Sequence, residues 1–332
     1  MNHKNTKRGF LLGIDVGNSK THALIADASG NVVGFADAGC GSYEVLGQQG
    51  YQIALQKITD NVILQAGIEK SDIVSMGFGI AGYDWPSEKP IIDAGIQALG
   101  IDVPYRFVND VVIGLIAGTT EGWGVAVDAG TGNNVRGRDE QGHEGRITGN
   151  GMWFGEFGGA GELVWLAMVM TTYAWSQRGP KTRLTQMFMD YAEADDENQL
   201  IEMLAMRQVV PPPALAKDIF RLAAEGDPVA SEVVACNAEQ LGLNVNAVIR
   251  QLNFEEKAVE IVLFGSIFNA GEIYIGPLRE TIHQFAPRAQ LMRLTVPPVI
   301  GAVLLAAETI GLSTKPIRQT LIKSTETYLT KS

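Results

Sequence analysis

Short apolar runs separated by small polar turns open the chain. Three such runs follow one another within the first forty residues, and each has the length and composition of a β-strand. Apolar residues then recur close to helical spacing over 49–66. The pattern predicts strands at 10–15, 21–27 and 31–37, a helix at 49–66, a strand at 72–80, a helix at 88–99, a strand at 105–108 and a helix at 110–117.

The second half of the chain begins the same pattern again. Strands at 124–128, 134–138 and 145–148 are predicted, followed by a helix at 158–177. A mostly helical insertion over 180–255 then intervenes, and Asp227 and Pro228 have the character of an N-cap and first residue of a long helix. The pattern closes with a strand at 259–264, a helix at 271–285, a strand at 291–296 and a helix at 298–310.

The repeated order indicates an α/β fold of two tandem domains, each with the sequence β-β-β-α-β-α-β-α. We place the first domain at 9–118 and the second at 119–297, with the insertion inside the second. The C-terminal residues 298–332 are expected to pack back on the first domain.

One motif occurs at the start of both halves. The segments 11–21 and 125–134 each hold an apolar strand that ends in an aspartate, Asp15 or Asp128, then a glycine-containing turn and a second extended run. Glycine leaves backbone N–H groups uncovered, so an anion can approach them closely. We therefore expect two turns that face each other across a cleft and hold a polyphosphate, each with an aspartate nearby for a metal ion.

Composition narrows the class of partner. The 332 residues are 46% hydrophobic and 19% charged, with a formal net charge of -11 and a pI near 4.9. This acidity argues against nucleic acid or an anionic membrane as partner, whereas backbone amides and Mg²⁺ can still hold a nucleotide locally. Cys40 and Cys236 form no zinc or disulfide pattern, and the apolar stretch behind the basic start at 1–8 is too short for a signal peptide or membrane span. A cytoplasmic protein is expected.

Seven segments carry a family resemblance through their order and spacing. They are IDVGNSKT (14–21), GIAGYD (79–84), FVNDVVIGLIAGT (107–119), DAGTGNNVRG (128–137), FGEFGGAGELVW (154–165), VLFGSIF (262–268) and PPVIGAVLLA (297–306). With these segments the chain resembles the N-acetylglucosamine kinase-like branch of the sugar kinase, Hsp70 and actin superfamily, also called the BadF/BadG/BcrA/BcrD ATPase family. The resemblance covers nearly the whole chain and implies two ribonuclease H-like (actin-like ATPase) domains.

The resemblance implies an ATP and Mg²⁺ site. Asp15 matches the residue that holds Mg²⁺, usually through water, although a turn-capping aspartate is the alternative. Asp128 stands where sugar kinases of this branch carry a small residue, and it either adds a charge directed at the metal or closes the turn. The implied nucleotide-binding residues are Gly17, Asn18, Ser19, Lys20 and Thr21 in the first turn, Gly130, Thr131, Gly132 and Asn133 in the second, and Gly265 and Ser266 at the adenosine.

Asp110 is the candidate catalytic base. It follows Asn109 where a strand is predicted to pass into a helix, and the matching residue of hexokinase-like kinases accepts the proton of the attacking hydroxyl. A plain N-cap is the competing interpretation. The implied substrate-binding residues are Ser42, Tyr43, Gly82, Asn109, Asp110, Gly155 and Glu156.

Two positions depart from the family pattern. Tyr43 stands where many N-acetylhexosamine kinases have asparagine, and Glu156 is followed by Phe157 in place of a second acid. Both changes fall in the implied sugar pocket, so the identity of the sugar stays open.

Four functions compete. The first is an ATP-dependent kinase for an amino sugar or N-acetylated hexosamine, in which domain closure excludes water. The others are a type III pantothenate kinase, which the strings at 14–19 and 128–131 suggest; a reductive-activator ATPase, which would need thiolates in other segments; and a non-catalytic sugar sensor. The oligomeric state is open, a homodimer included.

Overall fold

The first sheet is built from two hairpin-connected strand pairs and two crossovers. Residues 9–330 are described by a computed structural model; the basic start at 1–8 and positions 331–332 of the C-terminal prediction lie outside the described residues. The strand order is β3-β2-β1-β4-β5. β1 and β2 are antiparallel from Phe10↔Asp27 to Val16↔Thr21, and β1–β4 and β4–β5 are parallel. The strands are β1 (Phe10–Val16), β2 (Thr21–Asp27), β3 (Val32–Ala38), β4 (Ile73–Ile80) and β5 (Tyr105–Asn109).

The second sheet repeats this order. It runs β10-β9-β6-β7-β8, so its first three strands again lie together and the two later strands follow on the side of the first strand. The strands are β6 (Gly124–Ala129), β7 (Asn133–Arg138), β8 (Glu144–Arg146), β9 (Glu260–Phe264) and β10 (Gln290–Arg293). The predicted α/β fold with two tandem halves is confirmed.

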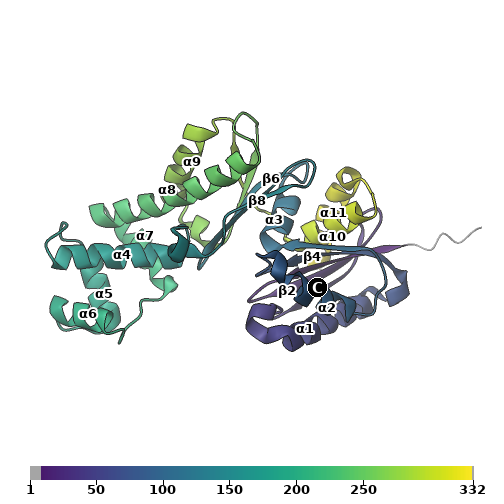
Figure 1. Cartoon of the computed structure of the whole chain (residues 1–332), viewed down its shortest axis with the longest axis horizontal. Helices are drawn as coiled ribbons and strands as arrows, with labels where there is room; N and C mark the ends of the chain where they lie inside the picture. Colours follow the sequence, from purple (N-terminus) through teal and green to yellow (C-terminus); the bar gives the residue numbers. More distant parts are fainter. Residues whose placement is uncertain (1–8, 331–332) are drawn as a thin grey trace, which may run out of the picture. The chain divides into compact units, whose positions relative to one another are not determined.

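Helices cover both faces of the first sheet (Figure 1). Leu12, Ile14 and Val16 point into one core with α1 and α2, as the period of two in a strand requires. On the other face, a Cβ at Gly77 would lie 2.1 Å from the Ala302 carbonyl oxygen, so glycine lets α10 approach the sheet closely. The helices of this part are α1 (Tyr43–Ala66), α2 (Lys89–Gln97), α3 (Asp110–Gly118), α10 (Val299–Thr309) and α11 (Thr314–Leu329).

The helices of the second part include the whole insertion. Asp227 caps α8 by accepting a hydrogen bond from the Ala230 N–H at 2.8 Å, and Pro228 is its first residue, as predicted. These helices are α4 (Ala160–Trp175), α5 (Leu184–Ala192), α6 (Glu197–Ala205), α7 (Ala216–Ala224), α8 (Pro228–Gln251) and α9 (Glu272–Phe285), with 3-10 turns η3 (Gly151–Phe154), η4 (Pro213–Leu215) and η5 (Ser266–Ala270).

The described residues separate into two compact units. Unit 1 contains the residues up to Ala126, residues 138–142 and those from Arg293 onward, and unit 2 contains 127–137 and 143–292. Within unit 1, α11 lies against β3, and the Ser324 hydroxyl accepts a hydrogen bond from the Val32 N–H at 2.8 Å. No helix among residues 9–330 is both long enough and apolar enough to span a bilayer.

Two element boundaries differ from the sequence prediction by more than two residues, and one further helix is present. α1 begins at Tyr43 rather than at 49, because Ser42 caps an additional segment that Gly47, at φ 68°, separates from the regular helix. β10 ends at Arg293 rather than at 296, ahead of Pro297 and Pro298, which cannot donate backbone hydrogen bonds. α11 was not predicted as a separate helix.

Candidate active site

The first glycine turn connects β1 to β2 in unit 1. Its ends are fixed by backbone bonds, from Gly17 N–H to the Lys20 carbonyl at 3.0 Å and from Gly41 N–H to the Gly17 carbonyl at 3.1 Å. Asn18, Ser19 and Lys20 are exposed, whereas Thr21 is buried and its hydroxyl has no hydrogen-bond partner among the described residues. The turn therefore presents three polar residues to solvent from a fixed base.

Asp15 lies beside this turn. It is the register partner of His22, whose Nδ1 lies 3.9 Å from the Asp15 carboxylate. Burial lowers the pKa of His22, so the imidazole is neutral near pH 7 and does not cancel the charge of Asp15. Proteins commonly bind Mg²⁺ with one or two carboxylates together with phosphate oxygens of the substrate. Asp15, beside this turn, is therefore a candidate ligand.

Asp110 begins α3 at the carboxyl end of β5. It is half-buried, and its Oδ1 accepts a hydrogen bond from the Val111 N–H at 3.0 Å. Asn109 precedes it as the N-cap, because the Asn109 Oδ1 also accepts from the Val111 N–H at 3.0 Å. The helix N-terminus favours an anion at this point. The N-cap position itself belongs to Asn109, and Asp110 is the first residue of the helix.

Two of the predicted sugar-binding residues of unit 1, Tyr43 and Asn109, hydrogen-bond to the segment 82–84. The Tyr43 hydroxyl donates to the Gly82 carbonyl. The Asn109 amide donates to the Tyr83 carbonyl and to Asp84 Oδ1, each at 3.2 Å. Ser42 is fully buried and accepts from the Glu44 N–H at 3.2 Å, so its side chain caps α1.

Three acids next to these residues were missed by the sequence reasoning. Glu44, Asp84 and Glu88 cluster around Tyr43, and Glu88 accepts from the backbone N–H of Asp84 at 2.8 Å. Burial, and then the charges of Asp84 and Glu88, raise the pKa of Glu44. The same influences raise the pKa of Tyr43 well above its usual range, so its hydroxyl remains a hydrogen-bond donor. In the sequence, the only sign of this acidic group was Asp84, the last residue of the motif GIAGYD.

The second glycine turn connects β6 to β7 in unit 2. Its carbonyl groups are held by the first turn of α4, from Ala160 N–H to Gly130 O at 2.9 Å and from Gly161 N–H to Thr131 O at 2.8 Å. Thr131 and Gly132 are exposed. A Cβ added at Gly130 or Gly132 would meet nothing within 4 Å, so open space adjoins this turn.

Gly265 brings a third predicted segment to the same turn. Its φ is +102°, and an added Cβ would lie 2.2 Å from the Ala129 carbonyl oxygen. Only glycine allows this contact, which places Ser266 at the start of η5 next to the end of β6.

A cavity of about 620 Å³ lies where these segments meet, within the size range of small-ligand sites. It brings together Gly130, Thr131 and Ser266, which were predicted from the sequence, with residues of the insertion that were not. Its lining consists of Gly130, Thr131, Ala160, Pro213, Ala214, Ala216, Lys217, Phe220, Ser266, Ile267, Asn269 and Ala270. Only helical spacing marked the insertion in the sequence, which gave no sign that η4 and α7 contribute a wall.

Asn133 and Glu156 support the neighbouring loop. Asn133 is buried, and its amide donates to the Glu156 carbonyl at 2.8 Å. The Glu156 carboxylate is also buried and accepts from Thr148 N–H at 2.7 Å, the Thr148 hydroxyl at 2.8 Å and Asn150 N–H at 3.0 Å. Gly155, at φ +72°, ends the 3-10 turn η3 and is exposed. The side chains of Asn133 and Glu156 thus fix the loop that carries Gly155.

Asp128 lies at the end of β6, one residue before the contact with Gly265. Burial raises its pKa to about 6. No three His, Cys, Asp or Glu side chains within residues 9–330 gather as a metal site. Asp15 and Asp128 belong to different units.

Known proteins are similar to the chain over most of its length. An N-acetylmuramic acid/N-acetylglucosamine kinase of Clostridium acetobutylicum is 25% identical over 299 residues, which are 90% of this chain and 98% of that protein. An N-acetyl-D-glucosamine kinase of Dictyostelium discoideum is 26% identical over 315 residues, 90% of this chain and 97% of that protein.

A solved structure shares the fold. The crystal structure of a putative N-acetylglucosamine kinase from Chromobacterium violaceum has a TM-score of 0.66 at 22% identity and covers 90% of this chain and 99% of its own. The sequence profile of the BadF/BadG/BcrA/BcrD ATPase family matches residues 12–306. That match spans both sheets and both glycine turns, which confirms the family resemblance: the chain belongs to the BadF/BadG/BcrA/BcrD ATPase family.

Proposed function

We propose that the protein is an ATP-dependent kinase that transfers the γ-phosphoryl group of ATP to a hydroxyl of an amino sugar or N-acetylated hexosamine. The cavity of about 620 Å³ at Gly130, Thr131 and Ser266 carries this proposal, because it joins an uncovered glycine turn to a pocket large enough for a nucleoside. Lys217 in its lining adds a positive charge for an anionic ligand.

The nucleotide occupies unit 2 in this proposal. The exposed turn 130–132 receives phosphate oxygens with its backbone N–H groups and the Thr131 hydroxyl, while Phe220 and Pro213 supply apolar surface for the base. Gly265 and Ser266 stand next to the nucleoside. The first turn, with Gly17, Asn18, Ser19, Lys20 and Thr21, is proposed to contact the outer phosphates.

Asp110 is the proposed catalytic base. The sugar hydroxyl oxygen attacks the γ-phosphorus, the bond from that phosphorus to the ADP oxygen breaks, and the hydroxyl proton moves to the Asp110 carboxylate. Tyr43, Gly82 and Asn109, which lie near one another in unit 1, are proposed to orient the sugar. Ser42 is proposed to shape that site through the backbone, because its side chain caps α1. In unit 2, Glu156 is proposed to fix the loop that carries Gly155.

Mg²⁺ fits the residues present. Asp15 offers a carboxylate beside the first turn, and Mg²⁺ is commonly bound by one or two carboxylates together with substrate phosphates rather than by a full protein cage. Asp128 is a second candidate ligand, at the other turn. When bound, the metal ion would neutralise charge on the phosphates.

ADP release tests the function most simply. The protein is assayed with ATP and a panel of N-acetylglucosamine, N-acetylmuramic acid, glucosamine, glucose and pantothenate, with Mg²⁺ or with EDTA. We expect release that depends on both Mg²⁺ and an N-acetylated or amino sugar. Turnover with pantothenate alone, hydrolysis that no sugar accelerates, or sugar binding without turnover would each replace this proposal by one of the alternatives.

A further inference from the structure

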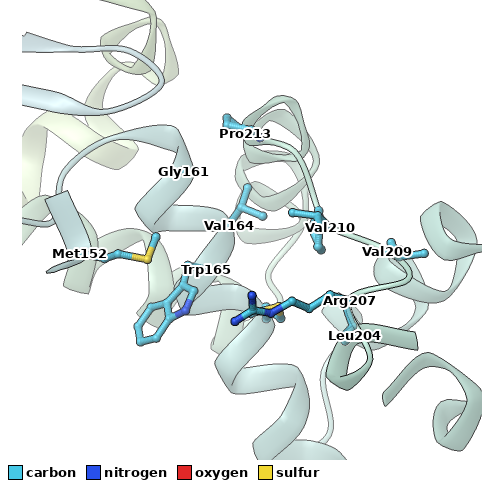
Figure 2. A pocket seen from close by; sticks show the side chains of 11 residues that line it. Met152, Gly161, Val164, Trp165, Leu204, Arg207, Val209, Val210 and Pro213 are labelled. Carbon is cyan, nitrogen blue, oxygen red and sulfur yellow. The ribbon is translucent and has the colours of Figure 1, made fainter. Parts of the chain in front are cut away.

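A second cavity of unit 2 lies outside the proposed nucleotide pocket. It measures about 460 Å³ and is bounded by α4, the end of α6 and the segment 209–213 (Figure 2). Val164, Trp165 and Met168 form one wall from α4, and Val210 and Pro211 form the other. Its size lies in the range of small-ligand sites.

This cavity is separate from the nucleotide pocket. Of the residues that line either space, only Pro213 lines both. The nucleotide pocket opens beside the phosphate turn, whereas the second cavity is lined by none of Gly130, Thr131 and Ser266. A ligand can therefore occupy it without taking the place of ATP.

The cavity is open to solvent along an apolar rim. Met152 is 40% exposed, Trp165 37% and Val210 71%. Large apolar side chains that converge on a concave site are typical of ligand pockets rather than of scattered surface residues. An apolar body bound there would cover surface that is now in water.

Arg207 supplies the only charge in this lining. No hydrogen bond or ion pair among residues 9–330 engages its guanidinium, and Figure 2 shows the side chain running across the cavity toward Trp165. Its backbone is fixed, with φ +55° at the end of α6 and a bond from its N–H to the Leu204 carbonyl at 3.2 Å. A guanidinium matches a carboxylate through two parallel hydrogen bonds.

We propose that this cavity binds a small monoanion with an apolar body. The anionic group pairs with Arg207, and the body packs against Trp165, Val164 and Met168. Neither the nucleotide nor the sugar of the proposed reaction has this chemistry, so the cavity is a further binding site.

A pair of fluorescent probes tests charge and shape separately. 8-Anilinonaphthalene-1-sulfonate carries one negative charge on its aromatic rings, and N-phenyl-1-naphthylamine has similar rings without the charge. We expect the anionic probe to bind at one site per chain and about 10-fold or more tighter than the neutral probe, the ratio typical of one charge-assisted hydrogen-bonded pair. Octanoate, an apolar carboxylate, should displace the anionic probe.

Two substitutions separate the contribution of the Arg207 charge from that of the apolar surface of Trp165. Arg207→Gln should weaken the anionic probe to the affinity of the neutral probe and leave the neutral probe unchanged. Trp165→Ala should weaken both probes by a similar factor. Trp175→Ala on the same helix and Arg178→Gln in the same unit are the matched controls, because neither residue lines the cavity, and both should bind as the unchanged protein does.

A third variant, Arg207→Asn, serves as the control for loss of folding. Asparagine tolerates the left-handed backbone of position 207, so Arg207→Asn should melt at the temperature of the unchanged protein or above it while it loses the preference for the anion. Equal affinity for the two probes, or unchanged affinity in both Arg207→Gln and Trp165→Ala, overturns the proposal. The probes report without ATP or turnover, so this result is independent of the proposed kinase activity.

Discussion

The two glycine turns have equivalent places in two sheets of identical strand order, yet the space around their glycines differs. At Gly17 an added Cβ would lie 2.6 Å from the Lys20 carbonyl oxygen, so the backbone of the turn itself requires glycine. At Gly130 and Gly132 an added Cβ would meet nothing within 4 Å. The first turn is closed by its own chain, and the second leaves space that a ligand can use.

The surroundings of the two turns differ in the same way. The second turn is attached to the N-terminus of α4 and adjoins a cavity that the insertion helps to line. Unit 1 instead carries Asp110 with a group of acids and polar residues at the ends of β4 and β5. Both halves share one topology. In the proposed function, the segments around it separate nucleotide binding from the chemistry at the sugar.

Of the substitutions that test this division of roles, Asp110→Asn has the largest expected effect, a loss of kcat. Asparagine keeps the shape of the side chain but does not accept the proton, so kcat should fall by about 10²- to 10⁴-fold. ATP affinity should stay within about twofold, because the nucleotide pocket lies in unit 2. Steady-state ADP release and ATP titration on the same preparation measure both, with the exposed Asp102→Asn as control. Retained kcat would remove Asp110 from the chemistry.

Gly265→Ala tests whether the close contact with β6 builds the nucleotide pocket. The new methyl group would lie 2.2 Å from the Ala129 carbonyl oxygen on a backbone at φ +102°, so we expect a loss of about 2 kcal/mol or more in the free energy of unfolding, together with weaker ATP binding. Gly271→Ala is the matched control: its φ is +71°, but its Cβ would meet nothing within 4 Å, so strain of about 1 kcal/mol is its only cost. Chemical denaturation with equal losses in the two variants would contradict the contact.

A pair of alanine substitutions compares the turns directly. Gly17→Ala should lower the free energy of unfolding by about 1–3 kcal/mol, because backbone atoms must shift. Gly132→Ala should leave the melting temperature unchanged and weaken ATP binding about tenfold, because its methyl group enters only the open space. Thermal melts and ATP titrations decide, and full ATP affinity in Gly132→Ala would show that the open space is not used by phosphate.

The fold could be predicted from the sequence because neighbouring residues mark each strand and helix, through apolar runs, turns and helix caps. Short apolar runs between polar turns marked β1 and β2, and the N-cap pair Asp227 and Pro228 marked the start of α8 correctly. The start of α1 was missed because Gly47 interrupts the helical spacing after the capping residue Ser42. α11 is a mostly polar helix, so its apolar spacing gave a weak signal.

Only part of the candidate site could be predicted from the sequence. Motifs identified both glycine turns and the residues Asp110, Tyr43 and Gly265, because each lies within one short segment. Pro213, Lys217 and Phe220 line the proposed nucleotide pocket although they lie more than forty residues before Ser266 in the chain, and no spacing rule links them. The commitment of Ser42, Asn133 and Glu156 to local hydrogen bonds also depends on tertiary contacts that a linear pattern does not contain.

Asp128→Asn sharpens the contrast between Asp15 and Asp128 through the pH dependence of stability. Burial raises the folded-state pKa of Asp128 to about 6 from 3.8, so the ionised side chain costs the folded state about 1–3 kcal/mol above pH 6 and nothing below pH 3.8. The variant should therefore gain stability over the unchanged protein as pH rises from 4 to 7. Melting in EDTA without nucleotide measures this, with Asp102→Asn as reference, and a difference that is constant with pH would argue against a buried carboxylate.

The proposed kinase function requires ATP to bind at the second glycine turn and at the turn after β9. Hydrogen–deuterium exchange with and without a non-hydrolysable ATP analogue, in Mg²⁺, tests this segment by segment on the unchanged protein. We predict slower exchange of the amides at 130–133 and 265–270 when the analogue is bound. Unchanged exchange in both segments, under conditions where the analogue is shown to bind, would contradict the account.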